Sequence, residues 1–438
     1  MFNFIIGKKV VVRLTNYFWH TCDDPSLTGE TSYAWMRRLS MIHPLSTGIY
    51  AWSPMGLKAL KKVSTLVREA QEAIGGLEVM MTMVQPLRLW QASGRAISYG
   101  PELVTWMDRK GEGCVCSPIS EEALTDFFKA HIQRASQLPQ YFFQLQWKFA
   151  DRETPGPGML RSRDFITADG CSFDADEKGM HQSRRRVVGS YANVFQRMGA
   201  SAVLVPDPEN PRAHQVVLLT PEGSLDVVYE DEAMHDALRQ GTLYEAQVAD
   251  ASTHTSSSSR TFVRGRGVQV GHITLWGTSI SNALGACVDH DDKASLPVFM
   301  GSYAINLSAL LAGLIGLFHD ARGIVWPDCF APFALSLMVM DENLRVPSDA
   351  VYAHLRKAGV DVLYDDRAVE PLVKKKDMDL LGLPYQAVVT SQQQVCVTNR
   401  ATGEEVTLAE SAFVSHAQAG TWSQVFGSNL SPRQQSLR

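Results

Sequence analysis

The spacing of apolar residues predicts two amphipathic helices in the first third of the chain. Across residues 56–75, apolar side chains recur every three or four positions, and two consecutive glycines end the pattern. Residues 121–135 repeat this arrangement, with alanine, leucine and phenylalanine on one side. Each segment is therefore expected to pack its apolar face against a core.

A hairpin of two antiparallel strands is predicted after the second helix. Residues 141–149 alternate in character, so that one face of the strand is apolar. A loop rich in proline and glycine follows at residues 153–158, and residues 165–173 read as the returning strand. The residues of the apolar face are Phe143, Leu145, Trp147 and Phe149.

The pattern changes after Pro332. Segments typical of strands and helices then alternate, in the order strand, helix, strand, helix, strand, which predicts a small α/β domain with a mostly parallel sheet. These segments are residues 335–340, 348–359, 360–364, 373–381 and 386–390. Antiparallel strands and helices upstream indicate a separate α+β domain. We therefore expect domains at residues 1–330 and 331–438, the second ending in a flexible tail.

Composition restricts the class of protein without identifying it. The 438 residues are 45% hydrophobic and 20% charged, which excludes a wholly disordered chain and a collagen-like fibre. The net charge of −5 provides no overall basic field for nucleic acids, although it is compatible with a local basic patch. Seven scattered cysteines are an odd number and favour free thiols in a reducing compartment.

No membrane span is expected from the sequence. The longest apolar run, residues 303–318, is shorter than the about 20 residues that cross a bilayer, and it contains Asn306 and Ser308. We therefore expect a buried helix there. The expected compartment is the cytoplasm. Mitochondrial import is the alternative, because residues 1–22 carry basic side chains and no acidic one.

Several longer strings resemble the class II prolyl-tRNA synthetases, in the short bacterial and mitochondrial-like form without the large editing insertion. The strings follow family order from about Arg13 to about Thr407, which is nearly the whole chain. They are residues 48–56 (GIYAWSPMG), 85–95 (QPLRLWQASGR), 159–165 (MLRSRDF), 301–303 (GSY), 323–327 (GIVWP) and 362–367 (VLYDDR). The resemblance implies an α+β class II synthetase-like catalytic domain, with an antiparallel sheet flanked by helices, and a C-terminal α/β anticodon-binding-like domain.

The resemblance also implies chemistry that this chain has lost in part. In the family, the amino-acid carboxylate attacks the α-phosphate of ATP, and arginines with Mg²⁺ offset the negative charge that develops. Two arginines, a glutamate that reads adenine and a glutamate that helps to hold the metal occupy four motif positions. All four positions differ here. The residues present are Ala150, Arg152, Ala309 and Gly316. We therefore expect no competent catalytic residues and no cofactor.

The amino-acid pocket implied by the resemblance is kept in part. Ile119 stands where a threonine would hydrogen-bond to proline, and Thr274 stands where an aromatic residue would line the proline ring. Other residues match the family and are candidates for a vestigial or rebuilt pocket. They are Glu121, Arg161, Arg163, His214 and His272. For either histidine, an ordinary hydrogen-bonded role is the plainer alternative. No metal site is predicted.

The C-terminal segment matches the family's anticodon-binding domain with two departures. Glu370 replaces an arginine, and Leu372 replaces the glycine of a turn. Basic residues that could contact RNA phosphates remain. They are Arg367, Lys374, Lys375 and Lys376. The alternative for the three lysines is a solvated helix face.

Three functions stay open at this stage. The first is a non-catalytic synthetase-like protein that acts as a regulatory or structural subunit. Its partner would be a second copy or another protein, bound through residues 48–56, which resemble the family's dimer-interface motif. The second is an active ligase with a rebuilt pocket, which would use ATP and Mg²⁺. The third is a module that binds tRNA or another RNA.

Overall fold

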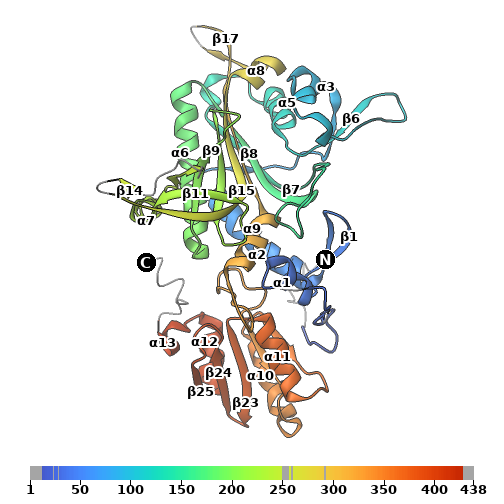
Figure 1. Ribbon diagram of the computed structural model, residues 1–438, viewed down its shortest axis with the longest axis vertical. Coiled ribbons are helices and arrows are strands. Elements are labelled where there is room, and N and C mark those ends of the chain that lie inside the picture. Colours follow the sequence, from blue (N-terminus) through green and yellow to red (C-terminus); the bar gives the residue numbers. More distant parts are fainter. Residues whose placement is uncertain are drawn as a thin grey trace, which may run out of the picture. The chain divides into compact units, whose positions relative to one another are not determined.

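The computed structural model describes residues 12–22, 24–27, 29–248, 256–257, 260–290 and 293–427 (Figure 1). The chain forms two compact units. The large unit comprises Pro44–Ala51 and Val63–Leu317, and the C-terminal unit comprises Met1–His43, Trp52–Lys62 and Phe318–Arg438. The predicted domain boundary at residues 330 and 331 stays a prediction. The predicted flexible tail falls on residues 428–438, which lie outside the described residues.

A mixed, mostly antiparallel sheet forms the centre of the large unit, in the order β12-β9-β10-β15-β18-β8-β7-β3 (Figure 1). Its strands are β3 (Leu77–Glu78), β7 (Gln140–Phe149), β8 (Asp164–Asp174), β9 (Ala202–Pro206), β10 (Ala213–Leu219), β12 (Tyr244–Glu245), β15 (Arg260–Gly277) and β18 (Phe299–Asn306). A second, small sheet has the order β4-β6-β5, from Val84–Pro86, Gly113–Cys116 and Thr105–Met107. The α+β class expected from the sequence is confirmed.

The predicted hairpin is strands β7 and β8, which pair antiparallel from Gln140 opposite Phe173 to Phe149 opposite Asp164. Residues two apart along β7 share a face, and the predicted apolar face runs from buried Phe143 to exposed Trp147. The opposite face of β7 is polar and buried. It carries Gln144 and Lys148, both fully shielded from solvent. A buried polar face requires partners from other elements, and those partners form the site described below.

Helices cover the sheet of the large unit. The predicted amphipathic helices are α2 (Pro54–Ala73) and α5 (Glu121–His131). Helix α6 (Glu177–Met198) starts where the Asp176 side chain accepts from the Gly179 amide, and it ends at left-handed Gly199. Helix α9 (Leu307–Leu317) packs on β8 and β15. Shorter helices are α3 (Leu87–Ala92), α4 (Arg95–Ser98), α7 (Asp231–Arg239) and α8 (Ser279–Leu284).

The prediction of one buried helix over residues 303–318 was wrong at its start. Residues 303–306 belong to β18, which pairs with β15 on one side and β8 on the other. Strand β18 is also buried along nearly its whole length. A strand that is buried on both faces is as continuously apolar as a buried helix, so periodicity does not separate the two. No helix among the described residues is long and apolar enough to cross a membrane.

The C-terminal unit has a five-stranded sheet in the order β22-β21-β23-β24-β25. Strands β21 (Leu335–Met338), β22 (Val362–Asp365) and β23 (Tyr385–Ser391) are parallel, which confirms the predicted alternation, and β24 (Gln394–Asn399) and β25 (Glu405–Ala409) add antiparallel partners. Its helices are α1 (Ser32–Arg38), α10 (Arg345–Lys357), α11 (Pro371–Leu381), α12 (Glu410–Ala419) and α13 (Ser423–Phe426). The segment around Arg13 pairs with the edge of β22, where the Leu14 amide donates to Tyr364 O at 2.8 Å.

Candidate functional site

A small cavity opens on one face of strands β8, β15 and β18, under helix α5. The space open to the centre of a water molecule is about 10 Å³, which is room for about one water. Its lining combines two acids and a histidine with apolar and hydroxyl groups. The lining residues are Ile119, Glu121, Leu124, Asp169, Gly170, Cys171, His272, Ser302, Tyr303 and Ala304.

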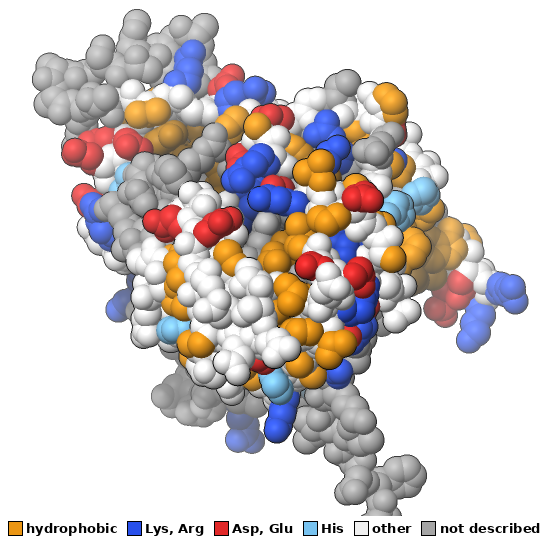
Figure 2. Space-filling model, turned by 90° about the horizontal axis from the view of Figure 1, so that it is seen from below, with side chains coloured by type: hydrophobic (Ala, Val, Ile, Leu, Met, Phe, Trp, Pro, Cys, Tyr) orange, Lys and Arg blue, Asp and Glu red, His pale blue; other side chains and the backbone are white. Residues whose placement is uncertain are grey.

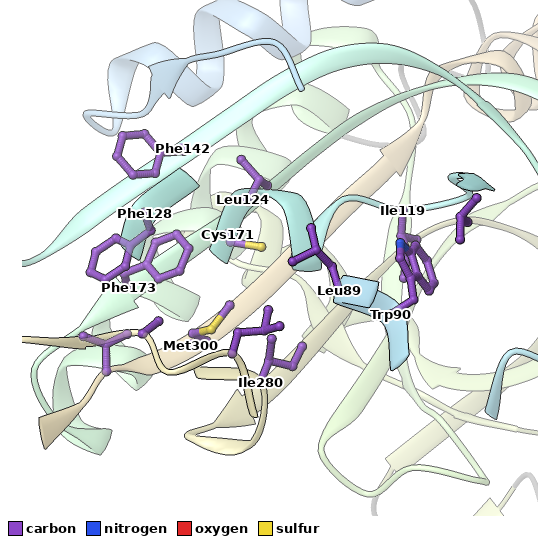
Figure 3. Close-up of a cluster of buried hydrophobic side chains, with 14 of the residues drawn as sticks. Leu89, Trp90, Ile119, Leu124, Phe128, Phe142, Cys171, Phe173, Ile280 and Met300 are labelled. Carbon is purple, nitrogen blue, oxygen red and sulfur yellow. The ribbon is translucent and has the colours of Figure 1, made fainter. Parts of the chain in front are cut away.

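The cavity rests on the hydrophobic core of the large unit. Figure 3 shows Ile119, Leu124 and Cys171, which line the cavity and also belong to this core. Deeper in the core the rings of Phe128 and Phe173 stack with centroids 4.2 Å apart. Because protein cores are close-packed, the walls of the cavity are held in place from behind.

Glu121 is the principal charged group of the cavity and is 4% exposed. Arg95 Nη1 lies 3.4 Å from Glu121 Oε2 and 3.2 Å from Glu122 Oε1. Burial acts to raise the pKa of Glu121, but the charge of Arg95, together with hydrogen bonds from the backbone and from Ser302, outweighs it, so that this pKa lies below its ordinary value. Burial raises the pKa of Glu122. Glu121 Oε2 has no hydrogen-bond partner among the described residues.

Arg95 is held in turn by aromatic rings. Its guanidinium carbon lies 4.6 Å from the centre of the Trp276 ring, a cation–π arrangement. The Trp276 indole donates to Ser302 Oγ at 2.8 Å, which ties the ring to the cavity wall. Arg95 belongs to the family string at residues 85–95, but its role as the partner of two buried acids was not predicted from the sequence. One buried arginine therefore forms ion pairs with two buried carboxylates.

His272 lines the cavity and lies in one row across the sheet with Asp169. The register pairs His272 with Ala304, Ala304 with Asp169, and Asp169 with Gln144. Burial lowers the pKa of His272, so the imidazole is neutral at pH 7.

His214 does not belong to this cavity, although the sequence analysis grouped it with His272. His214 pairs with Ile273, so the alternation of side chains puts it on the opposite face of the sheet from His272. Its Nε2 lies 3.8 Å from Glu245 Oε1, and Arg184 on helix α6 donates to the same oxygen. The sequence could not decide this point, because it depends on the register of two strands.

A buried polar network positions the loop that carries Glu121. Lys148 Nζ contacts Ser120 Oγ and lies 3.5 Å from Asp169 Oδ2. The Gln144 amide donates to Ser120 Oγ at 2.8 Å and to Asp169 Oδ2 at 3.1 Å. These contacts fix Ser120, the residue before Glu121. The signal that the sequence analysis missed was the polar residues at every second position of β7.

Three arginines, Arg152, Arg161 and Arg163, lie in or next to the loop between β7 and β8, and they differ in their contacts. Arg152 donates to the Ser162 carbonyl at 2.9 Å and lies over the Phe165 ring. Burial lowers the pKa of Arg152, and the charge of nearby Arg161 lowers it further. Among the described residues, no carboxylate lies within ion-pair distance of either of these two arginines. Arg163 is paired with Asp151.

The other three altered motif positions are packing positions. Ala150 and Ala309 are both buried. Gly316 lies in helix α9, where a Cβ atom would approach Glu222 Oε1 to 2.4 Å. The carboxylate of Glu222 therefore fills the space that a side chain at Gly316 would need.

The four basic residues predicted for RNA contact divide into two groups. Arg367 is paired with Asp365 at 2.7 Å and with Asp377 at 2.9 Å. Lys374 is 2% exposed and donates to the Val339 carbonyl, so its ammonium serves the interior of the C-terminal unit. The remaining two are exposed and have no ion-pair partner in the described part of the chain. They are Lys375 and Lys376.

No cluster of three or more histidine, cysteine, aspartate or glutamate side chains suited to a metal ion occurs within the described residues.

Comparison with known families identifies both parts of the chain. Residues 104–316 match the tRNA synthetase class II core domain (G, H, P, S and T), and residues 336–419 match the anticodon binding domain. The fold and these matches define a class II aminoacyl-tRNA synthetase architecture.

Curated relatives show to which group of class II synthetases the chain is similar. The proline--tRNA ligase of Zymomonas mobilis is 34% identical, with 92% of this chain and 98% of the relative aligned. That of Brucella ovis is 35% identical, covering 91% and 97% of the two chains. The chain belongs to the prolyl-tRNA synthetase family, in its short form.

A solved structure supports the same fold. The prolyl-tRNA synthetase from Cryptosporidium parvum, complexed with L-proline and AMP, superposes with a TM-score of 0.70 at 16% sequence identity. The match covers 93% of this chain and 78% of that chain.

Proposed function

We propose that this protein is a non-catalytic member of the prolyl-tRNA synthetase family and acts as a regulatory or structural subunit of an assembly. The observation that carries the proposal is the joint replacement of four family motif residues. The residues present are Ala150, Arg152, Ala309 and Gly316. The dimer-interface segment at residues 48–56 is the surface that we propose for self-association or for pairing with another synthetase.

The electrostatics of the site support this proposal. Transfer of the adenylyl group of ATP to a carboxylate needs fixed cations near the phosphates. Ala150 and Ala309 supply none, while Arg163 and Lys148 lie beside Asp151 and Asp169. Removing one charge-stabilising donor typically costs about 10²–10³ in rate, so the loss of two arginines removes useful turnover.

The residues present do not fit a magnesium-bound triphosphate. Gly316 has no ligand atom, and although the carboxylate of Glu222 lies beside it, the described residues contain no group of three or more side chains suited to a metal ion. The cavity at Glu121, with room for about one water, is also too small for a proline ring without movement of its walls. No catalytic step is therefore derived for this chain.

A second candidate is an active ligase with a rebuilt pocket that uses ATP and Mg²⁺. It is favoured by the retained cluster of Glu121, His272 and Arg95. Arg152 and Arg161 also favour it, because they have no ion-pair partner in the described part of the chain, although the charge of Glu102 acts on Arg152. These two arginines would have to replace the missing motif arginines.

Binding of tRNA by the C-terminal unit is a third candidate, which now rests on Lys375 and Lys376. Filter binding of tRNA over a range of salt concentrations tests it, because phosphate contacts give a steep salt dependence. We place the protein in the cytoplasm on the basis of its scattered free cysteines.

Two measurements on the purified full chain test the leading proposal. Calorimetry with ATP and Mg²⁺ should detect no binding in the micromolar range. Pyrophosphate exchange should give no signal with proline or with any other amino acid. The Zymomonas mobilis relative, assayed in parallel, controls for the reagents. Micromolar ATP binding or amino-acid-dependent exchange would overturn the proposal and favour the ligase.

A further inference from the structure

An exposed apolar surface lies at the first turns of helices α10 and α11 in the C-terminal unit. Val346 in α10 and Leu372 in α11 are each 78% exposed, and Val369 and Val373 are exposed by 41% and 45%. We call these four residues the apolar patch. Figure 2, viewed from the end at which α10 and α11 lie in Figure 1, shows hydrophobic side chains gathered among charged ones.

The two helix starts are joined by contacts within the unit. Arg345, next to Val346, donates to the Asp366 carbonyl at 3.3 Å, in the connection that leads to α11. Arg345 is also paired with Glu342. The cations Arg367 and Lys374 are likewise used inside the unit. Apart from Glu370, which is exposed, these charged groups next to the patch are therefore already paired inside the unit, and the apolar side chains of the patch face the solvent.

Two neighbouring lysines, Lys375 and Lys376, have no ion-pair partner among the described residues. Lys375 and Lys376 follow the patch in the second turn of α11, where residues three and four apart lie on the same side. The solvent face of α11 thus presents Leu372 and Val373 followed by two lysines. We infer that this face binds an acidic amphipathic peptide segment of a partner protein, with apolar anchors on the patch and carboxylates on the lysines.

The size of the patch favours a peptide over a second copy of the chain. Full burial of a valine or leucine side chain is worth about 1.5–3 kcal/mol, at about 25 cal/mol per Å² of apolar area. With the exposed fractions given above, the four side chains of the patch together expose an apolar area on the order of 200 Å². A stable interface between folded proteins buries about 800 Å² on each side. A single helical turn or short strand with one or two apolar anchors matches the smaller area.

The same features disfavour RNA as the occupant. A phosphate backbone would meet three apolar side chains at the start of α11, and only two exposed cations in the second turn. RNA recognition rests on several cations or on exposed aromatic rings for stacking. The exposed large hydrophobic residues of α11 are aliphatic.

Selection of peptides on the full chain tests the inference. A phage-displayed library of random 12-residue peptides is panned on the wild-type protein and counter-selected on Leu372→Glu. Enriched peptides should combine aspartate or glutamate with large apolar residues. Affinity for Leu372→Glu should be about tenfold lower or weaker, since a leucine contact of about 1.4 kcal/mol is lost. The double variant Lys375→Glu/Lys376→Glu should also bind less tightly.

Ile97→Glu provides the matched control, because Ile97 is 88% exposed and lies in the large unit. This variant should bind the peptides as the wild type does. A consensus of basic peptides, or no peptide that depends on Leu372, would overturn the inference. So would self-association that Leu372→Glu abolishes, or tRNA binding that needs the lysines but not Leu372. The inference builds on the interaction role proposed above, but the assay is independent of ATP chemistry, so the two can fail separately.

Discussion

Glu222 lies against Gly316 so closely that a single methyl group on the glycine would come within 2.4 Å of the carboxylate oxygen. The family resemblance implies an acid at this helix position. Here the helix has a glycine, and the side chain of Glu222, from the turn after β10, packs against it. Gly316 and Glu222 are therefore in packing contact, and the effect of this contact on the free energy of unfolding can be measured.

We expect Gly316→Ala to stabilise the protein only in a background that lacks the Glu222 side chain. Alanine favours a helix over glycine by about 1 kcal/mol. In the wild type, the new methyl group displaces the Glu222 carboxylate and loses that gain. In a Glu222→Ala background the gain should appear in the free energy of unfolding measured in urea. Equal effects in both backgrounds would show that Glu222 is not the obstacle.

Arg95→Met should strongly destabilise the large unit. The substitution leaves Glu121 and Glu122 buried without their cation, and loss of one partner of a buried ion pair costs about 3–5 kcal/mol. Denaturant unfolding measures the effect. Arg68→Ala is the control, since its pair with Glu78 is solvent-exposed and should be worth about 1 kcal/mol or less. A loss no larger than that of the control would refute the buried-pair assignment.

Stability should fall between pH 7 and pH 5 because of His272. Burial lowers its pKa in the folded state, so the unfolded chain takes up the proton first as the pH drops below about 6.5. The stabilisation is thus present above that pH and is lost below it. His272→Gln should flatten this part of the stability profile. An unchanged slope in the variant would mean that His272 titrates normally.

Asp320 should contribute stability at a lower pH. Burial opposes its ionisation, but hydrogen bonds from Arg400 at 2.7 and 2.8 Å outweigh it and lower the pKa of Asp320 to about 2. A lowered carboxyl pKa stabilises the fold above the ordinary value of 3.8, and this is lost as the pH falls towards 2. The difference in melting temperature between wild type and Asp320→Asn should therefore shrink from pH 5 to pH 2. A constant difference would argue against the pair.

The fold was largely predictable because it depends on patterns that are local in the chain. The helical spacing that predicted α2 and α5, the alternation of β7 and the order of strands and helices after Pro332 each reflect which face of an element is apolar. The run at residues 303–318 failed because a strand buried on both faces has no period of its own.

Most of the helices and strands, the family and the four altered motif positions follow from the order of the amino acids alone, since these are properties of neighbouring residues and of ordered strings. Three relations became known from the folded chain: Arg95 pairs with Glu121, His214 faces away from His272, and Lys374 is buried while Lys375 is exposed. These relations depend on strand register and on contacts between distant segments. Folding settles them through packing and the pairing of buried polar groups, which no local pattern encodes.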